Sequence, residues 1–152
     1  FGMRVIAFDP YVSADRAKEM GVEIMPTLEA VLVQSDFVSI HLPRTPETEG
    51  LIGEKELRMI KPGARLVNTA RGGIVDESAL AKALEDGHLS GAALDVFAVE
   101  PTTDSPLFGL PGVVVTPHLG ASTREAQEKV AIELAEVFVG FLKDGIVRNA
   151  VK

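Results

Sequence analysis

Three side chains that can bind an acid and move a proton follow stretches predicted to be buried strands. His118 comes after the apolar residues 113–116, Arg71 precedes two glycines, and Glu100 lies in a third such exit. The carboxyl ends of parallel strands meet at one sheet edge, where open α/β proteins bind ligands. Each residue has a simpler interpretation alone: a histidine satisfied in a turn, an arginine in a surface pair, a glutamate in a solvated loop. Their shared position favours one site.

These three residue types suit the oxidation or reduction of a hydroxy acid. An imidazole can act as acid or base near neutral pH, and the planar guanidinium of Arg71 matches a carboxylate. Glu100 beside His118 would stabilise imidazolium and orient the ring. Together they suit hydride transfer between a hydroxyl carbon and a nicotinamide, because the cofactor brings the hydride.

A fourth candidate, Asp9, follows residues 4–8, which are predicted to form a short buried strand. Dinucleotide-binding folds place a carboxylate at such a position to accept hydrogen bonds from the ribose. An aspartate in a solvated turn is the simpler alternative.

Helices and strands are predicted to alternate along the chain. Ser13, Thr27 and Asp76 are the expected helix N-caps, and Ser122–Glu125 fits a capping box. The predicted helices cover residues 14–20, 28–33, 54–60, 77–86 and 122–143, and the predicted strands cover residues 4–8, 36–41, 64–68, 91–97 and 113–116. This alternation predicts an α/β fold with a parallel sheet covered on both faces, because parallel strands need helical crossovers.

Composition narrows the function classes. The 152 residues carry a net charge of -7, which argues against nucleic acid, and no cysteine, which excludes disulfides and thiolate sites. His41, His88 and His118 lack metal-site spacing, so we expect no metal. No apolar run approaches the roughly 20 residues of a membrane span, and no signal peptide is recognisable, so a cytoplasmic location is expected.

Three motifs in order resemble those of the D-isomer-specific 2-hydroxyacid dehydrogenases: residues 68–76 (NTARGGIVD), residues 91–97 (GAALDVF) followed by Glu100-Pro101, and residues 117–120 (PHLG). The resemblance covers essentially the whole chain. It implies a Rossmann-like, doubly wound parallel sheet and NAD as the cofactor.

The resemblance also implies roles for individual residues. Arg71 would bind the substrate carboxylate, His118 would be the acid/base and Glu100 its partner, which makes these three the catalytic set. Asp95 would meet the nicotinamide carboxamide. The full set of implied cofactor contacts is Asp9, Leu42, Thr69, Ala70, Arg71, Asp95, His118 and Gly120.

One departure is the absence of the phosphate-binding motif G-x-G-x-x-G from the sequence. We expect this loop and the first strand to lie upstream of Phe1. Residues 1–145 would then be a partial NAD-binding domain, and residues 146–152 would start the return to a substrate domain. Expressed alone, residues 1–152 are expected to be inactive and to bind NAD weakly.

The expected activity is NAD-dependent oxidation of a D-2-hydroxy acid. Residues 118–127 (HLGASTREAQ) resemble the branch of the family that oxidises 3-phosphoglycerate to 3-phosphohydroxypyruvate at the entry to serine biosynthesis. A glyoxylate or hydroxypyruvate reductase is the alternative within the enzyme class, and a dinucleotide-sensing corepressor-like protein is the alternative outside it. The expected partners are a small hydroxy acid and further copies of the chain, as a dimer or tetramer, with no nucleic acid and no membrane.

Overall fold

The computed structural model describes residues 2–150. The chain divides into two compact units, Phe1–Pro117 and His118–Lys152.

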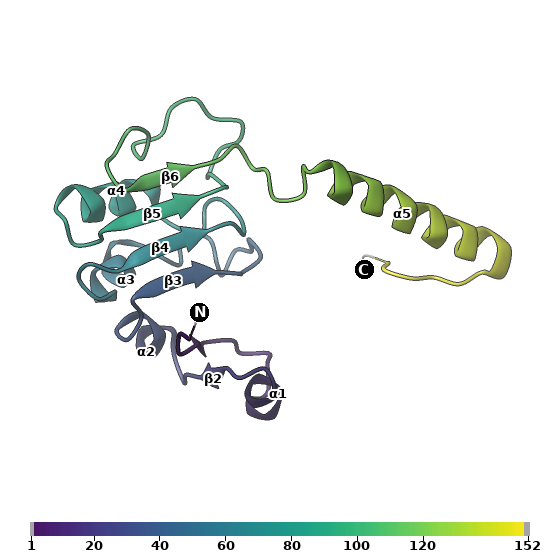
Figure 1. The fold of residues 1–152 in the computed structure, drawn as a ribbon, viewed down its shortest axis with the longest axis horizontal. Helices are drawn as coiled ribbons and strands as arrows, with labels where there is room; N and C mark the ends of the chain where they lie inside the picture. The colour runs from purple at the N-terminus through teal and green to yellow at the C-terminus, as the bar shows by residue number, and fades with distance from the viewer. Residues whose placement is uncertain (1, 151–152) are drawn as a thin grey trace. The chain divides into compact units, whose positions relative to one another are not determined.

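A four-stranded sheet forms the centre of the first unit (Figure 1). Its strands are β3 (Phe37–Ile40), β4 (Arg65–Asn68), β5 (Gly91–Leu94) and β6 (Val113–Val115), in that spatial order. All neighbouring strands are parallel, and Ile40, Asn68, Leu94 and Val115 stand in register. The predicted parallel sheet is confirmed, and the four strands end together at one edge.

A second, two-stranded parallel sheet pairs β1 (Ile6–Ala7) with β2 (Glu23–Ile24). Within residues 2–150, no hydrogen-bonded pairing joins β1 to β3. In the doubly wound order 3-2-1-4-5-6, the second and fourth strands lie on either side of the first. β1 corresponds to the second strand of that order and β3 to the fourth. Among the described residues, no strand lies between them.

Short helices connect the strands of the first unit. They are α1 (Ala14–Glu19), α2 (Leu28–Leu32), α3 (Glu54–Met59) and α4 (Glu77–Glu85). The three predicted N-caps are confirmed: Ser13 Oγ accepts from Arg16 N at 3.3 Å, Thr27 Oγ1 from Ala30 N at 3.2 Å and Asp76 Oδ1 from Ala79 N at 3.0 Å. These side chains satisfy backbone donors that have no partner inside the helix.

The core lies between the larger sheet and the helices α3 and α4, which contact each other (Figure 1). Alternate residues of β3 show the pattern: Val38 and Ile40 are buried, whereas Phe37 is 55% exposed. Leu57 of α3 and Leu80 of α4 are fully buried against this face. Within the first unit, helices α3 and α4 therefore cover this face of the larger sheet.

Predicted strand ends differ from the observed ones where side chains take over the backbone hydrogen bonds. The strand expected over residues 91–97 ends at Leu94, because the Phe97 N–H donates to the Glu100 carboxylate at 2.7 Å instead of to a neighbouring strand. The strand expected over residues 4–8 forms ladder pairs only at Ile6 and Ala7. The two-residue strand β2 was not predicted.

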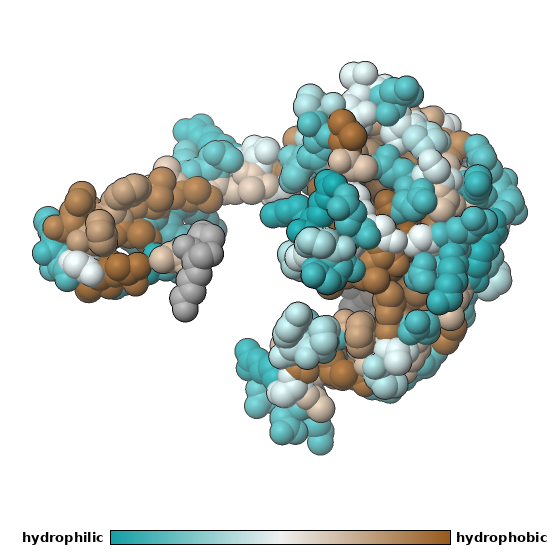
Figure 2. All heavy atoms as spheres, turned by 180° about the vertical axis from the view of Figure 1, so that it is seen from behind, coloured by the Kyte–Doolittle hydropathy of each residue, from teal (hydrophilic) through white to brown (hydrophobic). Residues whose placement is uncertain are grey.

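The second unit contains one long helix, α5 (Arg124–Asp144), which ends at Gly145 with φ 65°. Figure 2 shows apolar side chains gathered along it. The expected capping box is wrong by one residue. Thr123 is the N-cap, with Oγ1 accepting from Ala126 N at 3.2 Å, so the third helical position holds Ala126, whose side chain cannot complete the box. In the part of the chain that the structure describes, no helix is long and apolar enough to cross a membrane.

Candidate active site

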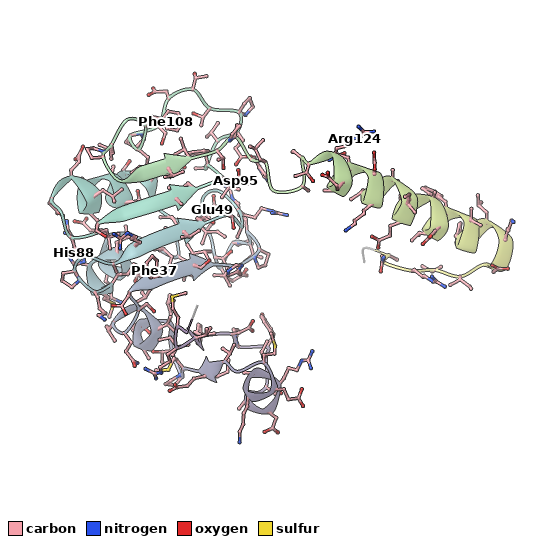
Figure 3. The ribbon with its side chains drawn as sticks, viewed as in Figure 1. Phe37, Glu49, His88, Asp95, Phe108 and Arg124 are labelled. Atoms are coloured by element: carbon pink, nitrogen blue, oxygen red, sulfur yellow. The ribbon has the colours of Figure 1, made fainter. Side chains whose placement is uncertain are left out.

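Two of the predicted site residues follow adjacent strands at the same edge of the larger sheet. Arg71 comes three residues after the last residue of β4, and Asp95 comes directly after β5. Asp95 N also donates to Asn68 O at 3.0 Å, which aligns the two strand exits. Figure 3 shows Asp95 at the end of the sheet toward which the strands point, and His88 at the opposite end.

The buried amide of Asn68 shapes the Arg71 loop, defined here as residues 69–73. Asn68 is 1% exposed, its Nδ2 donates to Arg71 O at 3.0 Å, and its Oδ1 accepts from Ala70 N at 3.1 Å. Beyond the end of the strand, the backbone groups of the turn no longer bond to a neighbouring strand, and the buried Asn68 amide supplies their hydrogen-bonding partner instead. Asn68 therefore fixes where the chain leaves the sheet.

Arg71 is exposed, and its Nη1 donates to Ala70 O at 2.6 Å. A guanidinium carries five N–H donors, so this bond leaves most of its fork available for a bidentate contact with a carboxylate.

Gly72 brings the Arg71 loop into direct contact with the next loop of the sheet edge. A Cβ at this position would lie 1.7 Å from Phe97 O and 2.8 Å from Ala98 N. Such separations are far shorter than any real contact, so only glycine permits this approach. The Arg71 loop and the Glu100 loop, defined here as residues 96–101, are thus packed backbone to backbone.

Asp95 is a carboxylate in a nearly closed environment. It is 7% exposed, and its Oδ1 accepts a short hydrogen bond from Thr116 Oγ1, the residue that follows β6. A buried carboxylate needs such donors because desolvation disfavours its charge. Asp95 and Thr116 therefore join the exits of β5 and β6.

Glu100 is exposed, and its Oε1 accepts from Phe97 N at 2.7 Å. This bond folds the Glu100 loop back on itself and holds one carboxylate oxygen at a defined place. Because Gly72 packs on Phe97, the loops that carry Arg71 and Glu100 share one contact point.

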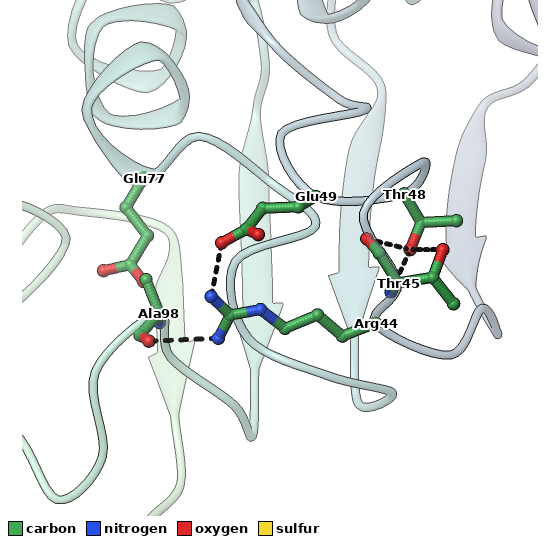
Figure 4. A network of polar contacts seen from close by, with 6 residues as sticks. All are labelled: Arg44, Thr45, Thr48, Glu49, Glu77 and Ala98. Atoms are coloured by element: carbon green, nitrogen blue, oxygen red, sulfur yellow. Dashed lines mark hydrogen bonds and ion pairs between the residues drawn. The ribbon is translucent and has the colours of Figure 1, made fainter.

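A polar network holds both the backbone N–H and the backbone C=O of Ala98 (Figure 4). Ala98 N donates to Glu77 Oε1 at 2.7 Å, and Ala98 O accepts from Arg44 Nη1 at 3.5 Å. Arg44 also forms an ion pair with Glu49. The backbone directly after Glu49 is held as well, since Gly50 N donates to Gly73 O at 2.8 Å.

His118 and Gly120 belong to the second unit, whereas the other predicted site residues belong to the first. His118 has a φ of 57°, the left-handed conformation that few residues other than glycine adopt. Such backbone strain gathers at functional sites. The pairing of His118 with Glu100 stays a prediction.

The other two histidines have hydrogen-bonding partners of their own. His88 Nε2 lies 3.2 Å from Leu57 O, and His41 Nε2 lies 2.9 Å from Ser39 Oγ. Within residues 2–150, no group of three or more His, Cys, Asp or Glu side chains is arranged to hold a metal ion.

The remaining predicted cofactor residues lie at strand exits of the first unit. Leu42 and Ala70 are partly buried against the core, Thr69 directly follows β4, and Asp9 follows β1 by two residues. One oxygen of Asp9 accepts from Tyr11 N at 2.8 Å, which holds the carboxylate at the turn. The role of this set in binding a dinucleotide stays a prediction.

Sequence reasoning missed several residues that shape this edge. Asn68 and Thr116 were included in predicted strands without a role, and a polar residue at the end of an apolar strand is a signal that could have identified them. Glu77 and Arg44 lie 21 and 54 residues from their common partner Ala98, and no local pattern reveals such pairings.

The comparisons agree with this geometry. A family model described as "D-isomer specific 2-hydroxyacid dehydrogenase, NAD binding domain" matches residues 1–120. The D-3-phosphoglycerate dehydrogenase of Mycobacterium tuberculosis is 57% identical over 136 residues, which are 90% of this chain and 26% of that protein. The enzyme of the same name from Bacillus subtilis is 50% identical over 151 residues, which are 99% of this chain and 29% of that protein.

A solved structure with the same arrangement is the NAD-complexed D-isomer specific 2-hydroxyacid dehydrogenase of Lactobacillus delbrueckii ssp. bulgaricus. Its TM-score is 0.85 at 36% identity, over 99% of this chain and 49% of that one. This chain spans between a quarter and a third of the length of the two curated relatives. The family match and the sheet-edge geometry together establish that the chain belongs to the D-isomer specific 2-hydroxyacid dehydrogenase family and corresponds to its NAD binding domain.

Proposed function

We propose that the complete gene product is an NAD-dependent D-2-hydroxyacid dehydrogenase that oxidises 3-phosphoglycerate to 3-phosphohydroxypyruvate, the entry to serine biosynthesis. The observation that carries the proposal is the contact of the Arg71 loop with the Glu100 loop beside Asp95, in a chain that is 57% identical to a D-3-phosphoglycerate dehydrogenase. A carboxylate binder and a proton-transfer partner then lie at the sheet edge where such folds bind dinucleotides.

Arg71 is assigned the role of binding the substrate carboxylate. Its exposed guanidinium is fixed through the short bond to Ala70 O and through the Asn68 amide below it. A planar fork on a fixed backbone selects both the charge and the orientation of an acid. Orientation matters because the hydroxyl carbon must face the nicotinamide in one sense for a D-specific reaction.

His118 is assigned the role of the acid/base that transfers the hydroxyl proton. As the alcohol carbon is oxidised, the hydroxyl proton passes to an imidazole nitrogen, and in the reverse direction the imidazolium returns it. Glu100 stabilises the imidazolium through its charge. His118 has a left-handed φ of 57°, and strained backbone of this kind occurs preferentially at functional sites, which supports a functional role for this residue.

The chemistry that NAD supplies when bound is the acceptance of the hydride. Asp9 is assigned the adenine ribose and Asp95 the nicotinamide carboxamide, with Leu42, Thr69, Ala70 and Gly120 as further contacts. The carboxylate of Asp95 is held by Thr116 Oγ1, so its position is defined before any ligand arrives.

Steady-state turnover of the complete gene product tests the proposal. The panel would be 3-phosphoglycerate, D-glycerate and D-lactate with NAD, and hydroxypyruvate and glyoxylate with NADH. We expect the highest kcat/KM for 3-phosphoglycerate. A preference for glyoxylate or hydroxypyruvate would instead identify a reductase, and nucleotide binding without turnover of any acid would identify a dinucleotide-sensing binding protein.

A further inference from the structure

We propose that Glu77 is a positioning residue for the proton-transfer step, because its carboxylate fixes the Glu100 loop against the first turn of α4. This inference rests on the proposed function, since it concerns the residue assigned to support His118.

Glu77 binds two residues that lie on either side of Glu100 in the sequence. Its Oε1 accepts from Ala98 N at 2.7 Å, and its Oε2 accepts from Ser105 Oγ at 2.9 Å. Ala98 precedes Glu100 by two residues, and Ser105 follows it by five. One carboxylate therefore closes the segment that carries Glu100, and both of its oxygens are used.

Both hydrogen bonds of Glu77 have a charged acceptor. A charged acceptor roughly doubles the strength of a hydrogen bond, and 2.7 Å is the short distance expected for it. Arg44 reaches Ala98 O, in the following peptide group, only at 3.5 Å, the outer limit of a hydrogen bond. Glu77 is therefore the main polar anchor of the Ala98 peptide.

Glu77 itself is well placed to be rigid. It is the first residue of α4, directly after the N-cap Asp76, where a negative charge is favoured by the helix dipole. Ala79 and Leu80, two and three residues further along the helix, are buried in the core. The carboxylate is thus mounted on a fixed element and not on a second loop.

The apolar anchors of the loop do not depend on Glu77. The rings of Phe97 and Phe108 meet edge to face at 5.4 Å, and Leu107 is fully buried. Loss of the carboxylate should leave these contacts and the fold in place, while the Ala98 peptide gains freedom. Because the adjacent Phe97 N–H holds Glu100 Oε1, the displacement passes to Glu100.

The test measures the pH dependence of kcat/KM in the complete gene product, with Glu77→Ala, Glu77→Gln, Glu100→Gln and the double variant Glu77→Ala/Glu100→Gln. Glu85→Gln is the matched control, because Glu85 is an exposed residue in the last turn of the same helix. Glu100→Gln should move the histidine-linked limb of the profile to lower pH, since a neutral partner favours imidazolium less.

Glu77→Ala should move the limb in the same direction and lower kcat/KM by about 10- to 100-fold, the scale of a displacement near 1 Å. Glu77→Gln should recover most of the activity, because an amide oxygen still accepts from Ala98 N and the serine hydroxyl can turn to accept from the amide nitrogen. The double variant should match Glu100→Gln alone, since residues acting through one another are not additive.

A limb that stays in place in Glu77→Ala, or additive losses in the double variant, would overturn the proposal. If the wild-type protein turns over none of the acids, the proposed function fails. Amide hydrogen exchange then still decides the case: Ala98 should exchange about 10-fold faster or more in Glu77→Ala, while the α4 amide of Leu80 is unchanged. Equal exchange of Ala98 in both proteins would refute the role of Glu77.

Discussion

Replacing Gly72 by alanine should separate the loop that carries Arg71 from the loop that carries Glu100. The added Cβ would lie 1.7 Å from Phe97 O, whereas a carbon–oxygen contact in proteins is about 3.3 Å or longer. The two backbones must therefore move apart by about 1.6 Å. Neither neighbour can yield by turning a side chain, because both partners in the clash are backbone.

The free energy of unfolding should fall by about 3 kcal/mol or more. Overpacking alone costs about 1–3 kcal/mol. Moving the Phe97 and Ala98 amides also weakens their bonds to Glu100 and Glu77, each a hydrogen bond to a charged group worth about 1.5–3 kcal/mol. For a domain of this size, 3 kcal/mol corresponds to a fall in Tm of about 6–12 °C.

Thermal unfolding and steady-state kinetics of the complete gene product measure the two consequences. Gly53→Ala is the matched control, because its Cβ would meet only Glu56 Oε2 at 3.5 Å and Gly50 O at 3.7 Å. That variant should lose about 1 kcal/mol at most, as a change at a helix N-cap. If Gly72→Ala melts and turns over like the control, the two loops do not make the close approach from which the site was built.

Four further outcomes are expected. Arg71→Lys should lower kcat/KM for the hydroxy acid by about 10-fold or more, because a point charge cannot copy a bidentate fork, and an unchanged kcat/KM would remove Arg71 from the role. His118→Asn should lower kcat by about 10²-fold or more, and a smaller loss would speak against proton transfer by this side chain. The wild-type protein should use NAD in preference to NADP, because Asp9 would repel a 2′-phosphate, and equal kcat/KM with the two cofactors would contradict this. The hydrogen bond from Arg58 lowers the pKa of Asp86 below its ordinary 3.8, so the stabilisation by this pair is present above that value and is lost as the pH falls through the lowered pKa. In Asp86→Asn, the free energy of unfolding in urea should therefore fall less steeply as the pH is lowered. The same pH dependence in the variant and the wild type would show that the pair does not stabilise the fold in solution.

Local patterns predicted the helix starts well because an N-cap is decided within four residues. Ser13, Thr27 and Asp76 each bond a backbone N–H three residues on, as their positions before apolar helices indicated. The start of the last helix is not decided by its local sequence. Ser122 and Thr123 are both eligible caps, and only the geometry selects Thr123.

The exit of β4 was predicted correctly, because an apolar run followed by a polar residue and glycines marks the end of a buried strand, and Arg71 therefore lies after β4 as expected. Asp95 was included in the strand expected over residues 91–97, whereas it lies directly after β5. The strand ends themselves were less predictable. The departure of the chain after Leu94 depends on a side-chain acceptor, Glu100, which binds the Phe97 N–H in place of a neighbouring strand.

The residues that connect the loops of the candidate site could not be identified from the sequence, because their effect depends on three segments that meet at the backbone of Phe97 and Ala98. Gly72 packs on Phe97 O, Glu77 binds Ala98 N, and Arg44 reaches Ala98 O from the third segment. Residues 72–77 hold Gly72 and Glu77 close together in the sequence, with no sign that both contact the same distant backbone.

That common contact has a consequence for how the site works. Arg71 and Glu100 are assigned to different tasks, carboxylate binding and support of the acid/base, yet the loops that carry them touch through the Phe97–Ala98 backbone. A movement of one loop therefore displaces the other, because packed backbones do not deform independently. Substrate orientation and proton transfer are then coupled through rigid backbone contact, so a change in either loop should alter both binding and turnover and not one of them alone.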